Sequence, residues 1–122
     1  MWKIKKSVLE SIVQAAQNTH PNEFIALLGG NLKKQIVEEW VILPSIFGSH
    51  HASIRMDLLP YTACTVGSVH SHPGFTNKPS GADKHLFSKE GEIHLIICLP
   101  FSFQTIQAYS TKGTPLEFEV IS

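Results

Sequence analysis

The pattern of apolar and polar positions predicts one helix near the N-terminus. Between residues 7 and 18 the apolar positions recur at helical spacing and form a single stripe, made of Val8, Ile12, Val13, Ala15 and Ala16. Ser7 and Glu10 have the spacing of a capping box, and Pro21 closes the segment. We therefore expect an amphipathic helix from Ser7 to about Asn18.

Most of the remaining chain alternates short apolar runs with turn-forming residues, which is typical of strands. Such runs occupy residues 23–30, 35–43, 65–70, 93–99, 103–110 and 115–122, and the last of them alternates like an edge strand. Residues 45–53 resemble a loop, residues 54–61 a short helix, and residues 80–89 a second helix. This order predicts one α+β, or mixed α/β, domain over residues 1–122.

Composition adds limits on the partners and the compartment. The chain has 122 residues, 43% of them apolar, and a formal net charge of zero, so nothing favours a nucleic acid or an anionic membrane as partner. No apolar run is long enough to span a bilayer. Cys64 and Cys98 are too few for a disulfide framework, so we expect a cytoplasmic protein with both buried in strands. One disulfide between neighbouring strands is the alternative.

The candidate chemistry lies in GSVHSHPGFTNKPSGAD, residues 67–83. His70 and His72 would project to one face of an extended strand, and Asp83 would meet them from the first turn of the helix opened by Ser80. Two imidazoles and one carboxylate leave one position of a tetrahedral Zn²⁺ ion for water, as in catalytic sites. Taken alone, Ser80 and Asp83 are better explained as an ordinary helix N-cap, and the combination with the two histidines favours the metal site; the two roles are compatible.

These residues resemble a known family. HSHPGFTNKPSGAD is similar to the H-x-H-x7-S-x2-D signature of the JAMM (MPN+) zinc metalloproteases, and HPNEFIALLGG is similar to the upstream segment in which that family carries a glutamate. Glu23 matches this glutamate, whereas Ala26 stands where the family often has glycine. The resemblance covers nearly the whole chain. It implies the JAMM/MPN core, a cytidine deaminase-like mixed sheet flanked by helices, in a compact prokaryotic member.

The resemblance also implies roles for single residues. His70, His72 and Asp83 match the ligands of one Zn²⁺ ion that carries the catalytic water. Glu23 matches the general base that takes a proton from that water, and Ser80 matches the donor to the oxyanion. We further expect Phe75 at the mouth of the site to contact the substrate, with simple loop packing as the alternative.

The implied activity is hydrolysis of the amide bond after the C-terminal glycine of a ubiquitin-like modifier with a Gly-Gly tail. Processing of a sulfur-carrier protein of the same fold is one alternative, and a non-catalytic scaffold is another, which the intact ligand set disfavours. A zinc deaminase would need a C-x-x-C pair that the sequence lacks. The strand at residues 115–121 is a candidate surface for a homodimer.

The other histidines have simpler expected roles. We expect His50 and His51 to lie in a solvated loop, His85 on a helix surface, and His94 packed in a strand. His20 should end the first helix.

Overall fold

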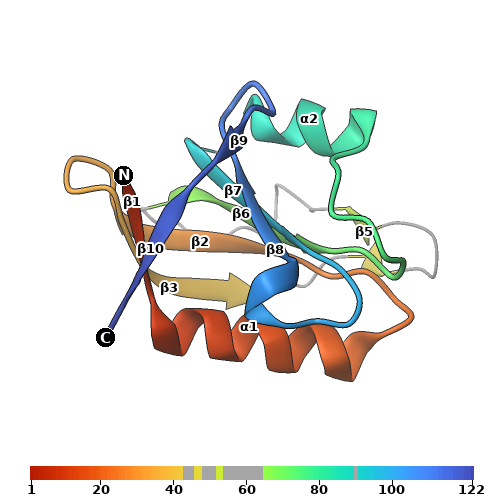
Figure 1. Cartoon of the computed structure of the whole chain (residues 1–122). Helices are drawn as coiled ribbons and strands as arrows, with labels where there is room; N and C mark the ends of the chain where they lie inside the picture. The colour runs from red at the N-terminus through yellow and green to blue at the C-terminus, as the bar shows by residue number, and fades with distance from the viewer. Residues whose placement is uncertain (43–45, 48–51, 54–64, 90) are drawn as a thin grey trace.

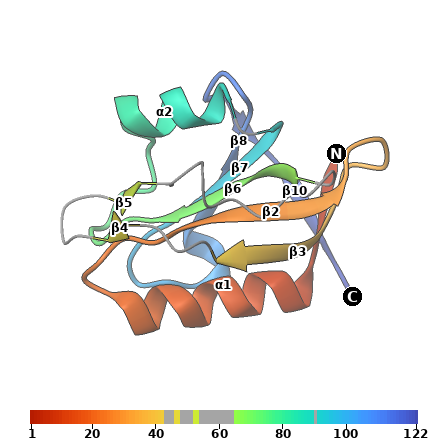
Figure 2. The same cartoon turned by 180° about the vertical axis from the view of Figure 1, so that it is seen from behind.

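The structure, a computed structural model of the chain, describes residues 1–42, 46–47, 52–53, 65–89 and 91–122. Its centre is a twisted mixed sheet in the order β10-β1-β3-β2-β6-β7-β8-β9. The strands are β1 (Trp2–Lys5), β2 (Ile25–Asn31), β3 (Ile36–Ile42), β6 (Thr65–Ser71), β7 (Ile93–Ile97), β8 (Ile106–Tyr109), β9 (Pro115–Leu116) and β10 (Phe118–Ile121). Helix α1 (Lys6–Thr19) and helix α2 (Gly81–Phe87) lie on opposite sides of this sheet (Figures 1 and 2).

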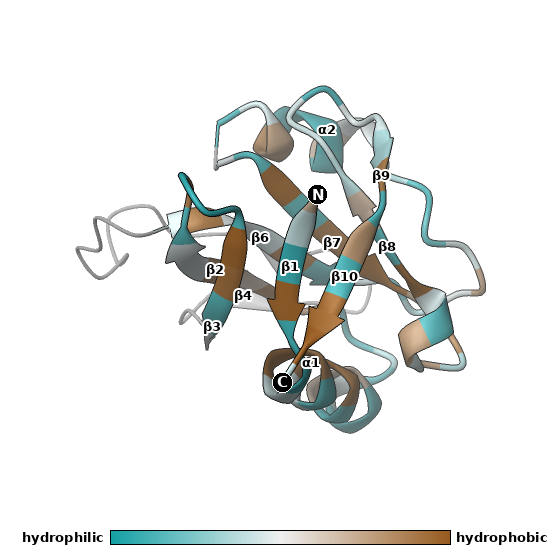
Figure 3. Cartoon of the chain, turned by 60° about the vertical axis from the view of Figure 1, so that its left-hand side comes forward, coloured by the Kyte–Doolittle hydropathy of each residue, from teal (hydrophilic) through white to brown (hydrophobic). Residues whose placement is uncertain are grey.

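The main core lies between α1 and the sheet. The apolar stripe of α1 is buried there through Val8, Leu9, Ile12 and Ala16. Figure 3 shows hydrophobic colour along the central strands and hydrophilic colour on most connecting loops. The predicted helix and the α+β class are thus confirmed.

The start of α1 differs from the sequence prediction. The helix begins at Lys6, and its N-cap is Lys5, which makes no side-chain capping bond. The expected capping box of Ser7 and Glu10 is therefore wrong. The physical reason is β1, which the sequence analysis missed: residues 2–5 pair in parallel with both β3 and β10, and the chain enters the helix directly from that strand.

Strands β2, β6 and β7 build the end of the sheet that carries His70. Strand β2 is antiparallel to β6, with Ile25 opposite His70, while β6 is parallel to β7. Helix α2 lies in the crossover between β6 and β7. The two parallel strands approach so closely at Gly67 that a Cβ atom there would lie 1.5 Å from the carbonyl oxygen of Ile93, so only glycine fits this position.

Two further strand predictions need correction. Residues 103–105 form a 3₁₀ turn before β8, and the expected strand at 115–122 is split at Glu117 into β9, which pairs with β8, and β10, which pairs with β1. Both pieces lie at the ends of the strand order, so the edge position is confirmed.

The expected loop at 45–53 contains two short paired strands, β4 (Ile46–Phe47) and β5 (Ala52–Ser53). The short helix expected at 54–61 lies outside the described residues.

Two smaller expectations concern cysteines and membranes. Cys98 is buried and makes no disulfide, while Cys64 lies outside the part of the chain that is described. Within the described residues, no helix has the length and apolar character needed to cross a bilayer.

Candidate metal centre

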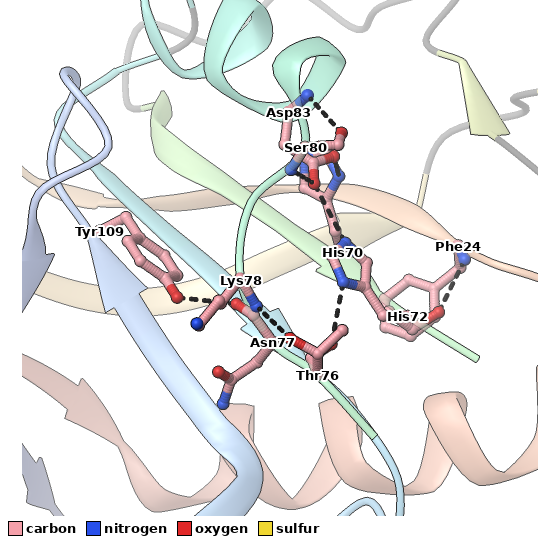
Figure 4. A network of polar contacts seen from close by, with 10 residues as sticks. Phe24, His70, His72, Thr76, Asn77, Lys78, Ser80, Asp83 and Tyr109 are labelled. Atoms are coloured by element: carbon pink, nitrogen blue, oxygen red, sulfur yellow. Dashed lines mark hydrogen bonds and ion pairs between the residues drawn. The ribbon is translucent and has the colours of Figure 1, made fainter. Parts of the chain in front are cut away.

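Three side chains predicted as metal ligands meet at the end of β6. His70 Nδ1 lies 3.1 Å from Asp83 Oδ1, and His72 Nε2 lies 3.0 Å from Asp83 Oδ2. Figure 4 shows the two imidazoles converging on the carboxylate, which comes from the first turn of α2. The strand end therefore supplies two nitrogen donors and the helix supplies the oxygen donors, as the spacing predicts.

Asp83 is also part of a helix cap. The amide of Ser80 donates to Asp83 Oδ2 at 2.8 Å, and the amide of Asp83 donates to Ser80 Oγ at 3.1 Å. These reciprocal bonds form a capping box at the start of α2. The cap and the ligand role therefore coexist, and the cap fixes the direction in which the Asp83 carboxylate points.

The electrostatics of the cluster favour a negative carboxylate. Burial would raise the pKa of Asp83, but hydrogen bonds from His70 and His72 outweigh it and hold that pKa well below its usual range. Burial lowers the pKa of His72, yet the hydrogen bond and charge of Asp83 outweigh this effect, so the pKa of His72 is raised. The cluster thus presents a fixed negative charge to whatever cation enters it.

The donor set fits zinc in chemistry, because imidazole nitrogens and carboxylate oxygens are ligands that zinc takes. The two contacts of 3.0 and 3.1 Å end on different oxygens of Asp83 and are hydrogen-bond distances. No group of three or more His, Cys, Asp or Glu side chains in the described chain is arranged to hold a metal ion. His70 Nε2 is buried without a hydrogen-bond partner and is a nitrogen that a metal could satisfy. The residue types therefore fit zinc, while the hydrogen-bonded arrangement would have to open to admit it.

The orientation of His72 is set from behind by a backbone carbonyl. His72 Nδ1 lies 3.1 Å from the carbonyl oxygen of Thr76 (Figure 4). Since that carbonyl only accepts, Nδ1 donates to it, and Nε2, which here bonds Asp83, would be the nitrogen that faces a metal once its own proton is lost. The sequence analysis missed this contact, because no side-chain type marks a carbonyl that serves as an acceptor.

The structure brings Glu23 to the same end of the sheet. It lies two residues before Ile25, which is opposite His70, and its side chain is half-buried. The negative charge of Glu23 also raises the pKa of His72, as one of the weaker influences on that pKa. The Glu23 carboxylate is therefore close enough to His72 to act on it electrostatically.

The remaining predicted site residues lie farther out. Ser80 is exposed at the rim, and Phe75, in the loop between His72 and Ser80, has 82% of its surface exposed. His85 is exposed on α2, as expected for a helix-surface residue. His50 and His51 fall outside the described residues.

Comparison with known proteins identifies the family. Residues 5–111 match the family described as prokaryotic homologs of the JAB domain. The chain belongs to this prokaryotic branch of the JAMM/MPN+ family. It is also 31% identical to a probable metalloprotease of Haloferax volcanii, over 97% of this chain and 78% of that protein.

Solved structures agree with this assignment. One described as a JAMM metalloprotease-like zinc site in the proteasome and signalosome shares 34% identity with a TM-score of 0.79, covering 100% of this chain and 99% of that one. A JAB1/MPN domain protein from Archaeoglobus fulgidus shares 33% identity with a TM-score of 0.78, covering 100% and 98%. These relatives support a zinc metalloprotease.

Behind the JAMM cluster lies a second buried histidine. His94 is fully buried on β7, and its Nε2 lies 3.2 Å from the carbonyl oxygen of Gly91. This carbonyl only accepts, so Nδ1 is the acceptor for the Ser68 hydroxyl at 2.7 Å. The ring stacks on Phe87 at 4.4 Å, and Phe87 also makes an edge-on contact with His70. His94 is packed, as predicted.

This JAMM protein should lose stability in mild acid because of His94. Burial lowers the pKa of His94 to about 4, and the nearby charge of His70 acts in the same direction. The unfolded chain binds the proton near pH 6.5, so stability is complete above that pH and falls as the pH drops toward 4. The expected loss is about 2 kcal/mol between pH 7 and pH 5.

Urea unfolding at several pH values, with a chelator present, measures this slope. The His94→Gln variant should show a slope that is flatter by this amount, whatever its stability at pH 7. If the unfolding free energy of wild type and of His94→Gln changed equally with pH, the loss of stability in acid would not come from His94.

Proposed function

We propose that this protein is a zinc-dependent isopeptidase or peptidase that hydrolyses the amide bond after the C-terminal glycine of a ubiquitin-like modifier. The observation that carries the proposal is the convergence of His70, His72 and Asp83 at contacts of 3.0 to 3.1 Å, beside the carboxylate of Glu23. Membership of the JAMM family supports the same chemistry.

In this proposal His70, His72 and Asp83 hold one zinc ion. When bound, zinc supplies a Lewis acid that lowers the pKa of water to about 7 and polarises a carbonyl. The protein contributes the placement of its own groups: the Thr76 carbonyl orients His72, and the capping box orients Asp83. Both supports include a backbone group, the Thr76 carbonyl and the Ser80 amide.

Glu23 is the general base of the proposed reaction. Its carboxylate takes a proton from the attacking water and transfers it to the departing amine when the C–N bond breaks. Its half-buried position and its electrostatic influence on His72 support this role, since a base must lie close to the water that it activates.

Ser80 is the donor to the developing oxyanion. Its oxygen already accepts the amide of Asp83 at 3.1 Å, so the hydroxyl hydrogen remains to donate outward. The residue is exposed at the rim, where a substrate carbonyl would enter. Loss of one such donor typically costs about 10²–10³ in rate.

The family and the rim of the site both support this substrate class. A Gly-Gly tail is narrow enough to reach a cluster whose His70 and Asp83 are only 5% and 8% exposed. Phe75, with 82% of its surface exposed, offers an aromatic contact for the modifier beside that tail. Removal of a modifier from lysine and processing of a sulfur-carrier protein both place the same tail in the site.

Cleavage of defined conjugates tests the proposal. Incubation of the zinc-loaded protein with a lysine-linked modifier and with a linear fusion, followed by mass measurement of the products, should show a cut after the terminal glycine. A chelator should abolish the cut, and changing the penultimate glycine to valine should slow it. A protein that binds zinc and cleaves neither substrate would instead be a scaffold.

A further inference from the structure

At the start of β2, the hydroxyl of Ser71 accepts a hydrogen bond that a backbone carbonyl of β6 would accept in a regular ladder. Ile25 lies opposite His70, so Phe24 lies opposite Ser71. In a regular antiparallel pair the two residues would exchange both N–H···O=C bonds. Here the amide of Ser71 donates to the Phe24 carbonyl at 3.1 Å, but the Phe24 amide donates to Ser71 Oγ at 2.9 Å.

The Phe24 amide bonds the side chain and not the carbonyl of Ser71 because the regular pairing of β2 with β6 ends at Ile25 and His70. The next amide, that of His72, donates to the carbonyl of Ile97 on β7 at 2.8 Å, as alternate amides of a strand between two neighbours do. The Ser71 hydroxyl therefore lengthens the ladder between β2 and β6 by one bond. Beyond that bond the next residue is Glu23.

Both the side chain and the backbone of Phe24 are held in place. Its ring is 2% exposed and lies 5.9 Å from the ring of Trp40, and its amide and carbonyl are both bonded to Ser71. Ser71 is itself 2% exposed, so water cannot easily replace its hydroxyl. A buried amide without an acceptor is strongly unfavourable, and loss of the hydroxyl should make the start of β2 shift toward solvent.

We propose that Ser71 is a positioning residue that holds the Glu23 carboxylate against the His70–His72–Asp83 cluster. Alternate residues of a strand face opposite ways, so Ser71 points away from the face that carries the two histidines. It can therefore set the place of the base without supporting the ligands. The inference rests on the proposed function, since it takes Glu23 as the general base.

The test compares Ser71→Ala with Ser71→Thr and Ser68→Ala. Threonine keeps the hydroxyl, whereas Ser68→Ala removes another buried hydroxyl from the same strand, one that donates to His94 and does not accept from the Phe24 amide. We expect Ser71→Ala to lower kcat by about 10- to 100-fold, as misplacement of a reacting group does, with KM and zinc content unchanged. Ser71→Thr should restore kcat, and Ser68→Ala should keep it within about twofold of wild type.

A second readout needs neither zinc nor substrate. Hydrogen exchange of the Phe24 amide, followed by NMR in the zinc-free protein, should accelerate in Ser71→Ala and remain slow in Ser71→Thr and Ser68→Ala. Unchanged kcat or unchanged Phe24 exchange in Ser71→Ala would overturn the inference, and so would an equal loss of kcat in Ser68→Ala.

The outcomes separate the two proposals. If wild type shows no chelator-sensitive hydrolysis, the proposed function fails, and the exchange experiment still decides whether Ser71 holds residue 24. If Glu23→Ala abolishes hydrolysis while Ser71→Ala does not change it, the proposed function stands and the positioning role is refuted.

Discussion

Replacing Glu23 with glutamine should lower kcat for cleavage of a modifier conjugate by about 10²–10⁴-fold, the usual contribution of a general base. Glutamine has nearly the same shape but cannot accept the proton of the attacking water. The three candidate ligands are untouched, so the zinc content should stay at the wild-type level. Initial rates at saturating substrate, together with metal analysis of the same samples, measure both quantities.

A matched control separates the base from a general charge effect. Glu10→Gln makes the same chemical change at an exposed position on α1, so kcat should not change. A Glu23→Gln protein that cleaves at the wild-type rate would remove Glu23 from the mechanism. One that loses both zinc and activity would make Glu23 part of the metal site instead.

Replacing Asp83 with asparagine should weaken zinc binding by at least about 100-fold, because changes even to groups behind the ligands typically cost 10- to 100-fold in affinity. Asparagine keeps an oxygen that can accept the Ser80 amide, so the helix cap persists while the negative charge is lost. Competition with a zinc-chelating dye measures the affinity, and activity at limiting zinc should fall in parallel.

Ser80→Ala is the control for the cap. It removes the other bond of the capping box, from the Asp83 amide to Ser80 Oγ, and leaves the carboxylate in place. Zinc affinity should change far less than in Asp83→Asn, although the hydrolysis rate should fall through loss of the oxyanion donor. If both variants weaken zinc binding equally, zinc affinity would depend on the intact helix cap and not on the charge of Asp83.

The sequence predicted the cluster because its members are close in the chain and chemically distinctive. His70 and His72 share a strand end, and Asp83 lies within the first turn of the next helix, so local geometry alone brings them together. Glu23 is distant in sequence, and its place followed only from the resemblance to the JAMM family. The register of Ile25 with His70 is the physical reason why it reaches the site.

The features that the sequence did not reveal depend on contacts across the sheet. Residues 2–5 are too few to show a period, and they form a strand only because β3 and β10 lie on either side. Ser71 gave no signal as a small polar residue between two histidines, and its importance appears only once Phe24 is seen opposite it. The sharing of Asp83 between helix cap and cluster could be anticipated, whereas the Thr76 carbonyl could not.

The split of the last strand at Glu117 has a consequence for the order in which the sheet can form. Consecutive short strands β9 and β10 complete opposite ends of the sheet order, and β10 joins Phe118 to Trp2, almost the full length of the chain apart. During synthesis β1 must wait for this neighbour until the residues between them have been made. Contacts between such distant positions close late, because the intervening loop costs entropy. The candidate metal centre, whose proposed ligands lie within residues 70–83, needs no such delay.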